Sequence, residues 1–134
     1  MGGDEAMIVA GVGFRRSVAA DEIVVLVELA LERASLARDA LDRLATIAAL
    51  AETPAFKEAA RRLNVTAIPV TESALAEAAP HVRTQSARSI AAHGVGSVAE
   101  AAALAAAGSR ASLIVERIAS PAATCALVRL ETRP

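Results

Sequence analysis

The sequence predicts an α/β protein with three layers, α/β/α, in which a mostly parallel sheet ends in a C-terminal antiparallel hairpin. Apolar runs typical of buried strands alternate with helical repeats along the chain. Two β-rich runs close it, residues 112–118 and 124–131, and the segment between them is too short for a crossover helix. Because 134 residues is the size of one ordinary domain, we expect residues 1–134 to form a single domain.

The first strand and the helix after it have the clearest pattern. Residues 6–13 are continuously apolar and end in Gly11 and Gly13, which predicts a central strand buried on both faces and then a tight turn. Apolar residues recur at helical spacing over residues 20–34. A strand, a glycine turn and a helix are therefore expected in that order.

The next part of the chain predicts two helices with a strand between them. Ser35 is expected to cap a short helix whose apolar stripe ends at Leu44, and residues 46–50 to form the strand. Thr53 and the proline after it are typical of a helix start, and Asn64 of a helix end. These elements extend the strand–helix alternation.

The rest of the chain is less regular. Residues 65–70 predict a third strand, which Pro69 places at an edge because proline lacks a ladder donor. Residues 71–79 predict a short helix, and the polar residues 80–96 a surface loop in which one helical turn can occur. Residues 97–108 begin with a capping-box pattern and predict an alanine-rich helix that ends at its last glycine.

The composition argues against several classes of function. With no Trp or Tyr and two Phe, the chain lacks aromatic platforms for single-stranded nucleic acid. A net charge of −1 gives no overall attraction to nucleic acids or membranes, and we expect neither as a partner. The single cysteine, Cys125, fits a buried strand position and cytoplasmic residence. No metal ion or cofactor is expected.

Two glycine segments carry the candidate binding residues. In the first, Gly11 and Gly13 precede Arg15, Arg16 and Ser17 between a strand and a helix, where backbone N–H groups and guanidinium groups suit an anion. The alternative is a tight turn with solvated arginines. Arg16 occupies the third glycine position of a dinucleotide fingerprint, so this is a weak nucleotide motif.

The second segment runs from His93 through Gly94, Gly96 and Ser97 to Glu100 and also enters a helix N-terminus. Loops beyond the carboxyl ends of parallel strands converge, so the two segments are predicted to face each other across a cleft. Glu100 is either a capping-box partner or a proton carrier, and His93 either a surface side chain or a proton donor.

These segments resemble a known family. Residues 11–17, the triplet Thr84-Gln85-Ser86, residues 94–104 and the closing strand 123–129 are together similar to the CobE/CbiG C-terminal domain family of cobalamin biosynthesis. The resemblance implies a role around ring contraction of the precorrin macrocycle. In the family, CbiG opens a lactone on the ring and releases a two-carbon fragment as acetaldehyde, whereas the isolated domain resembles CobE.

The sequence departs from the family pattern at three places. Family members often have Cys where Phe14 stands, Gly where Ser17 stands, and a proline and lysine near Val115-Glu116-Arg117. Because the arginines and glycine segments are kept while these groups are absent, the resemblance favours binding over catalysis.

We therefore expect a protein that binds a precorrin or corrinoid intermediate, with other cobalamin-biosynthesis enzymes as possible partners. A lactone-opening enzyme using Glu100 or His93 is the first alternative, and a nucleotide-binding regulatory module the second. The candidate binding residues are Gly11, Gly13, Arg15, Arg16, Ser17, Thr84, Ser86, Gly94, Gly96, Ser97 and Glu100.

Overall fold

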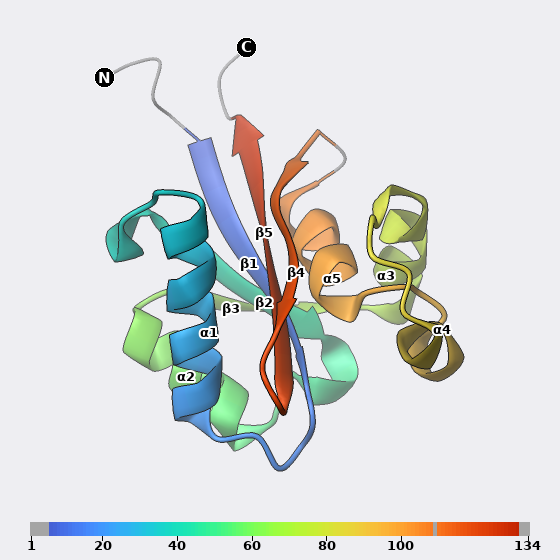
Figure 1. The fold of residues 1–134 in the computed structure, drawn as a ribbon, viewed down its shortest axis with the longest axis horizontal. Helices are drawn as coiled ribbons and strands as arrows, with labels where there is room; N and C mark the ends of the chain where they lie inside the picture. Colours follow the sequence, from blue (N-terminus) through green and yellow to red (C-terminus); the bar gives the residue numbers. More distant parts are fainter. Residues whose placement is uncertain (1–5, 109, 132–134) are drawn as a thin grey trace.

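A computed structural model describes residues 6–108 and 110–131. The described strands are β1 (Ala6–Phe14), β2 (Arg43–Ile47), β3 (Thr66–Val70), β4 (Ser112–Ala119) and β5 (Ala123–Glu131). The described α-helices are α1 (Ala20–Arg33), α2 (Pro54–Leu63), α3 (Glu72–Ala78), α4 (Ala87–His93) and α5 (Val98–Ala107). Figure 1 shows their arrangement.

The strands form one mixed sheet in the order β3-β2-β1-β5-β4. β1, β2 and β3 are parallel, whereas β5 lies antiparallel to β1 on one side and to β4 on the other. The predicted fold class, with a C-terminal antiparallel hairpin, is confirmed. β1 lies in the centre and β3, which contains Pro69, lies at an edge, as the sequence predicts.

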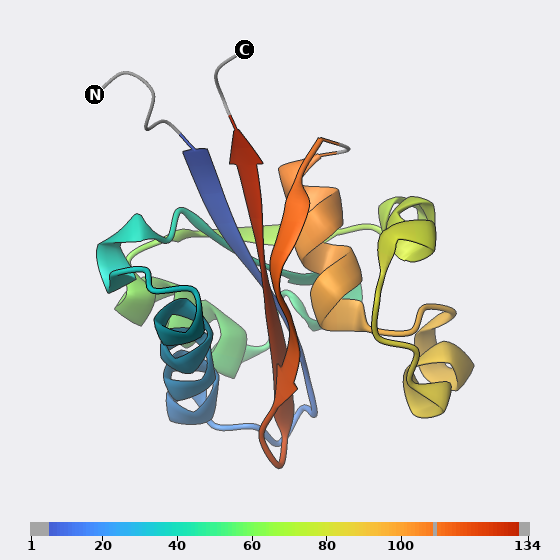
Figure 2. The ribbon, with the colours of Figure 1, turned by 45° about the horizontal axis from the view of Figure 1, so that its top comes forward.

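Helices cover both faces of the sheet and make the predicted three layers. α1 and α2 pack on one face, α5 and α3 on the other, while α4 stands outside the layers (Figures 1 and 2). The side chains of β1 alternate between the two cores: Ile8 and Val12 belong to the core under α1, and Val9 to the core under α5.

The packing of α5 on β1 depends on a missing side chain. A Cβ atom on Gly11 would lie 2.0 Å from the carbonyl oxygen of Ala99 and 2.6 Å from the backbone nitrogen of Ala103. Both atoms belong to the α5 backbone, which therefore lies directly against the central strand. Gly11 is required for this close approach.

The predicted tight turn lies beyond the two glycines, at residues 15–18, where the Val18 amide donates to the Arg15 carbonyl at 2.9 Å. β1 continues to Phe14, and both glycines lie inside it, paired with Ala126 and Thr124 of β5. Their amide groups sit in a strand that pairs with β5, and the chain turns only after them. The first glycine segment is thus a packing surface for a helix, which resembles a glycine turn when only the sequence is read.

The helix predicted up to Leu44 and the strand predicted at residues 46–50 are also displaced. A single 3-10 turn covers Arg38–Ala40, β2 spans Arg43–Ile47, and residues 48–50 form another 3-10 turn. Asp42 explains the difference, because its carboxylate accepts a hydrogen bond from the Ile8 amide at 2.9 Å and its own amide donates to the Ile8 carbonyl. This attachment to β1 overrides the helical spacing.

The segment predicted as a loop contains a seven-residue helix, α4. The Ser86 hydroxyl caps it by accepting a hydrogen bond from the Ser89 amide, and Gly94 ends it in the left-handed conformation, with φ of +77°. The helix is hard to recognise in the sequence because it is short, lies between polar residues and buries none of its side chains.

No single helix among the described residues is long and apolar enough to cross a membrane. α4 and α5 pass the same length and composition test only when they are taken together, and they meet at an angle of 60°.

We predict that Gly11→Ala lowers the free energy of unfolding by about 3 kcal/mol, because backbone atoms of α5 must move to admit the new methyl group. Gly13→Ala is the matched control. A Cβ atom on Gly13 would lie 3.0 Å from the Thr124 hydroxyl oxygen, which belongs to a side chain that can rotate away. Urea unfolding of the two variants measures the difference, and equal losses would contradict this account of Gly11.

Candidate functional site

A cleft of about 320 Å³ opens at the carboxyl end of β1. Its walls come from the end of β1, the turn between β4 and β5, one side of α4, and the start of α5. The two segments that the sequence predicts to face each other both contribute to it, through Arg15 from the first and His93 and Ser97 from the second. α5 begins here because the Ser97 hydroxyl accepts a hydrogen bond from the Glu100 amide.

Positive charge dominates the lining of the cleft. Arg15 comes from the end of β1, Arg88 from α4 and Arg117 from β4, and the imidazole of His93 also lines the cleft. The lining residues include no Asp or Glu, and the ion pairs among the described residues involve Lys57 and arginines outside the cleft. Guanidinium groups without carboxylate partners suit a ligand that brings its own negative charge.

The cleft is also lined by hydroxyl groups. Ser86, Ser89, Ser97, Ser120 and Thr124 all line the cleft. The Ser89 oxygen is buried and has no hydrogen-bond partner within the described protein, although a buried hydroxyl group normally has one.

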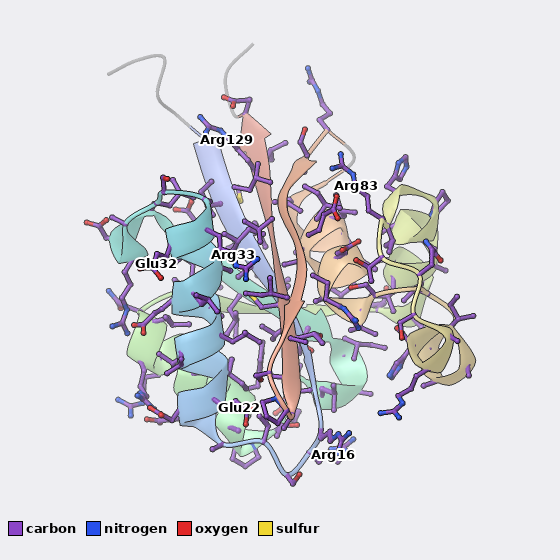
Figure 3. The ribbon with its side chains drawn as sticks, in the orientation of Figure 1. Arg16, Glu22, Glu32, Arg33, Arg83 and Arg129 are labelled. Atoms are coloured by element: carbon purple, nitrogen blue, oxygen red, sulfur yellow. The ribbon has the colours of Figure 1, made fainter. Side chains whose placement is uncertain are left out.

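The turn between β4 and β5 is held in place by the first turn of α1. The Glu22 carboxylate accepts hydrogen bonds from the Ser120 hydroxyl and from the Ala122 amide at 2.7 Å, and these bonds lower the pKa of Glu22. Figure 3 shows Glu22 close to this turn. The Arg15 amide donates to the Ala122 carbonyl at 3.0 Å, so the end of β1 and the hairpin form one wall.

Glu100 lies behind the cleft and is fully buried. One carboxylate oxygen accepts hydrogen bonds from the amides of Arg83 at 2.7 Å and Thr84 at 3.1 Å. The other accepts from the Thr84 hydroxyl at 2.6 Å and the Arg117 amide at 2.8 Å. The side chain therefore ties together α5, the segment before α4, and β4.

These contacts keep Glu100 ionised. Burial is the largest single influence and by itself raises the pKa of this carboxyl group. The hydrogen bonds from Thr84, Arg117 and Arg83 act in the opposite direction, and the net result is a pKa below the usual 4.5. A buried carboxylate that accepts four hydrogen bonds is suited to holding structure together, and both of its oxygens are occupied by these donors.

The structure brings some of the predicted site residues together and leaves others apart. Those that line the cleft are Gly13, Arg15, Ser86, His93 and Ser97. Those outside its lining are Gly11, Arg16, Ser17, Thr84, Gly94, Gly96 and Glu100. Of these, Arg16 donates to the Ala49 carbonyl at 3.1 Å, and Figure 3 shows it on the loop after β1.

Gly96 and Thr84 support the cleft indirectly. A Cβ atom on Gly96 would lie 2.2 Å from the Thr84 carbonyl oxygen, so the two chain segments are in direct contact. The Ser86 amide donates to the Gly96 carbonyl at 3.0 Å beside this contact. The family resemblance at residues 84–86 and at Gly96 therefore reflects a backbone contact between these two segments.

Two of the three cleft arginines are missed by the sequence analysis. Arg88 lies in the polar segment predicted as a loop, and the only available signal is that such segments often carry sites. Arg117 lies on β4, where nothing in the local pattern distinguishes it from a solvated strand residue. Only the meeting of α4 with the hairpin reveals them.

A larger hollow of about 580 Å³ lies on the other side of the segment that leads to α4, between α3, α5 and the start of β4. Its lining mixes Glu77 with His81 and Arg83, and Arg83 already contacts Glu116 at 3.4 Å. We assign the candidate site to the smaller cleft because no carboxylate in the described part of the chain pairs with its arginines.

Comparison with known proteins gives the family. The family described as Cobalamin synthesis G C-terminus matches residues 8–128. The chain belongs to this family. It is a cobalamin biosynthesis protein of the CobE/CbiG type, as the glycine segments predict.

Relatives of this family share both sequence and fold. Protein CobE of Sinorhizobium sp is 38% identical over 122 residues, which cover 91% of this chain and 79% of the relative. The crystal structure of a CobE, described as a protein from the cobalamin (vitamin B12) biosynthetic pathway, superimposes with a TM-score of 0.89 at 31% identity. That match covers 95% of this chain and 96% of the other.

Two further structures extend the comparison. Cobalamin biosynthesis protein chiG from Agrobacterium tumefaciens str. C58 has a TM-score of 0.73 at 31% identity, with 95% of this chain and 100% of that chain covered. A cobalamin biosynthesis protein G homologue from Sulfolobus solfataricus has a TM-score of 0.75 at 28% identity, with 96% of this chain and 38% of that chain covered. The same CobE/CbiG fold thus occurs in both short and long chains.

We predict that Glu100→Gln lowers the free energy of unfolding by about 3 kcal/mol, because the amide NH₂ group of Gln cannot accept the hydrogen bonds that one carboxylate oxygen receives. Glu77→Gln, at an exposed position on α3, is the control and is expected to change it by less than about 0.5 kcal/mol. Urea unfolding at neutral pH checks both. Equal stability of the two variants would contradict the role assigned to Glu100.

The same carboxylate predicts a dependence on pH. Because the folded-state pKa of Glu100 lies below its usual 4.5, its contribution to stability is present above that pH and is lost as the pH falls through the folded value. The stability gap between the parent protein and Glu100→Gln is expected to narrow as unfolding is measured at successively lower pH below 4.5. A gap that stays constant would show that Glu100 is not ionised in the folded protein.

Proposed function

We propose that this protein binds a precorrin or corrinoid intermediate around the ring-contraction stage of cobalamin biosynthesis, and that it does so in the cleft at the carboxyl end of β1. The observation that carries the proposal is the convergence of Arg15, Arg88 and Arg117, from three separate elements, with no carboxylate in the lining. A corrin precursor is an apolar ring fringed with acetate and propionate carboxylates. Guanidinium groups bind such carboxylates with two parallel hydrogen bonds each.

The size of the cleft indicates how much of the ligand it takes. At about 320 Å³ it is at the lower end of the range for sites that enclose small molecules, and a tetrapyrrole is larger than those molecules. We therefore infer that one carboxylate-bearing edge of the ring enters the cleft while the remainder stays outside. A protein that holds one edge leaves the rest of the ring accessible to a second enzyme of the pathway.

Binding is favoured over chemistry by the placement of the two candidate proton carriers. Glu100 is buried behind the cleft with its oxygens occupied, which leaves His93 as the candidate that lines the cleft. Arginine, which has no available proton transfer at neutral pH, supplies the remaining charge. The arrangement suits recognition of an anion better than general acid–base catalysis.

We predict that Arg15→Gln, Arg88→Gln and Arg117→Gln each weaken binding of hydrogenobyrinic acid about tenfold, because each removes a charged hydrogen-bond donor. The dissociation constant is measured from the shift of the corrinoid absorption spectrum on titration. Arg33→Gln, at an exposed position near the end of α1, is the matched control and should bind as the parent does. The proposal fails if the parent protein gives no spectral shift when protein and hydrogenobyrinic acid are mixed at about tens of micromolar. It also fails if Arg33→Gln weakens binding as much as the cleft variants do.

Lactone opening remains the second candidate function, and the position of His93 in the cleft is the observation that favours it. If His93 transfers a proton, incubation with a lactone-bearing precorrin should release acetaldehyde, detected by coupling to alcohol dehydrogenase, and His93→Ala should slow the release about a hundredfold. An absence of acetaldehyde with the parent protein, or an unchanged rate with His93→Ala, would remove His93 as the proton carrier.

A further inference from the structure

We propose that residues 86–96, called the clamp below, move as one unit and close over the cleft when a ligand binds. The inference rests on the proposed function for the identity of the ligand. The clamp consists of α4 with its capping residue Ser86 and the glycine-containing turn that leads to α5.

The two ends of the clamp are fixed to each other and to the body of the protein. The Ser86 amide donates to the Gly96 carbonyl at 3.0 Å, and the Gly96 backbone lies against Thr84. Thr84 is in turn held by the buried Glu100 carboxylate through its amide and its hydroxyl group. A loop whose ends are joined in this way can move about its base without disturbing the sheet.

Apart from Val95, whose side chain packs in the core under α5, the clamp has little to hold it in one position. None of the residues of α4 is buried, and Ile90 is 46% exposed. Figures 1 and 2 show α4 standing away from the sheet, beyond α5. Its internal hydrogen bonds, from the Ile90 amide to Ser86 and from the Gly94 amide to Ile90, keep the helix intact as it moves. Elements with few buried apolar contacts lie at the low end of local stability.

The charges of the cleft are divided between the clamp and the body. Arg88 lies on the clamp, whereas Arg15 and Arg117 lie on the strand side. In the absence of a ligand the like charges of the two walls repel, and a ligand with several carboxylates would bridge them. The unpartnered Ser89 hydroxyl, also on the clamp, would gain an acceptor on closure. Closing the clamp is thus favoured by the ligand that we propose.

Hydrogen exchange tests the mobility of the clamp in the protein without ligand. We expect the amides of α4 to exchange at least about a hundredfold faster than those of α5, which is buried against the sheet. Both helices lie within one chain, so α5 is an internal control. Protection of α4 equal to that of α5 would overturn the proposal.

Distances between two spin labels test closure. Labels at Val25→Cys on α1 and Ile90→Cys on the clamp report the clamp position, because both side chains are exposed. The native Cys125 stays unlabelled because it is fully buried, and burial raises the pKa of its thiol to about 12. Labels at Val25→Cys and Ile114→Cys, on α1 and β4, form the control pair within the body.

With saturating hydrogenobyrinic acid, we expect the distance distribution between positions 25 and 90 to narrow and shift, and that between 25 and 114 to stay unchanged. Binding is followed in the same samples by the absorption spectrum. If the absorption spectrum shifts while the distance distribution between positions 25 and 90 does not, the proposed closure of the clamp is wrong and the proposed binding function stands. If the spectrum does not shift, the binding function fails, and the hydrogen exchange of α4 then decides the mobility of the clamp by itself.

Discussion

The buried carboxylate of Glu100 is the interaction on which the site depends. It brings three parts of the chain, distant in sequence, to one point: the start of α5, the segment at Arg83 and Thr84, and the strand position at Arg117. A buried charge without partners is costly, so the four donors and the carboxylate must be present together. The pairing of β4 with β5 shifts register between Val115 and Ile118, and this irregularity surrounds the residue whose amide Glu100 binds. The hairpin is thereby placed opposite α4, and the cleft is the space between them.

Much of the fold can be predicted from the sequence because its pattern is repeated along the chain. The apolar run of β1, the helical spacing of α1 and the short segment inside the terminal hairpin each agree with the layer that they form. The prediction fails where a single distant contact decides the local structure. Residues with helical spacing are extended near Asp42 because Asp42 forms hydrogen bonds with Ile8. Gly11, which the sequence places near a turn, lies within β1 because the backbone of α5 packs against it.

In the candidate site, too, the sequence predicts part of the arrangement and distant contacts decide the rest. The sequence correctly brings two separated segments to one cleft, since the carboxyl ends of strands and the starts of helices meet at one edge of such a sheet. It assigns several residues to the ligand that serve the framework instead: Gly11 accommodates a helix, Gly96 contacts Thr84, and Glu100 holds both walls. Motifs of close packing and motifs of anion binding use the same small residues, and only the three-dimensional neighbours separate them. Arg88 and Arg117 show the converse, because single charged residues in a polar segment or on an edge strand have no local signature.

The antiparallel insertion of β5 beside β1 has a consequence for how this fold is joined to other protein segments. Ala6 at the start of β1 pairs with Glu131 at the end of β5, so the described chain enters and leaves the sheet at the same end of its strands. The cleft lies at the opposite end of these strands. Additional protein on either side of such a fold would attach at the end of the sheet remote from the cleft. The fold is therefore suited to modular fusion, in which a neighbouring domain is appended without obstructing the cleft, as well as to existence as a short chain.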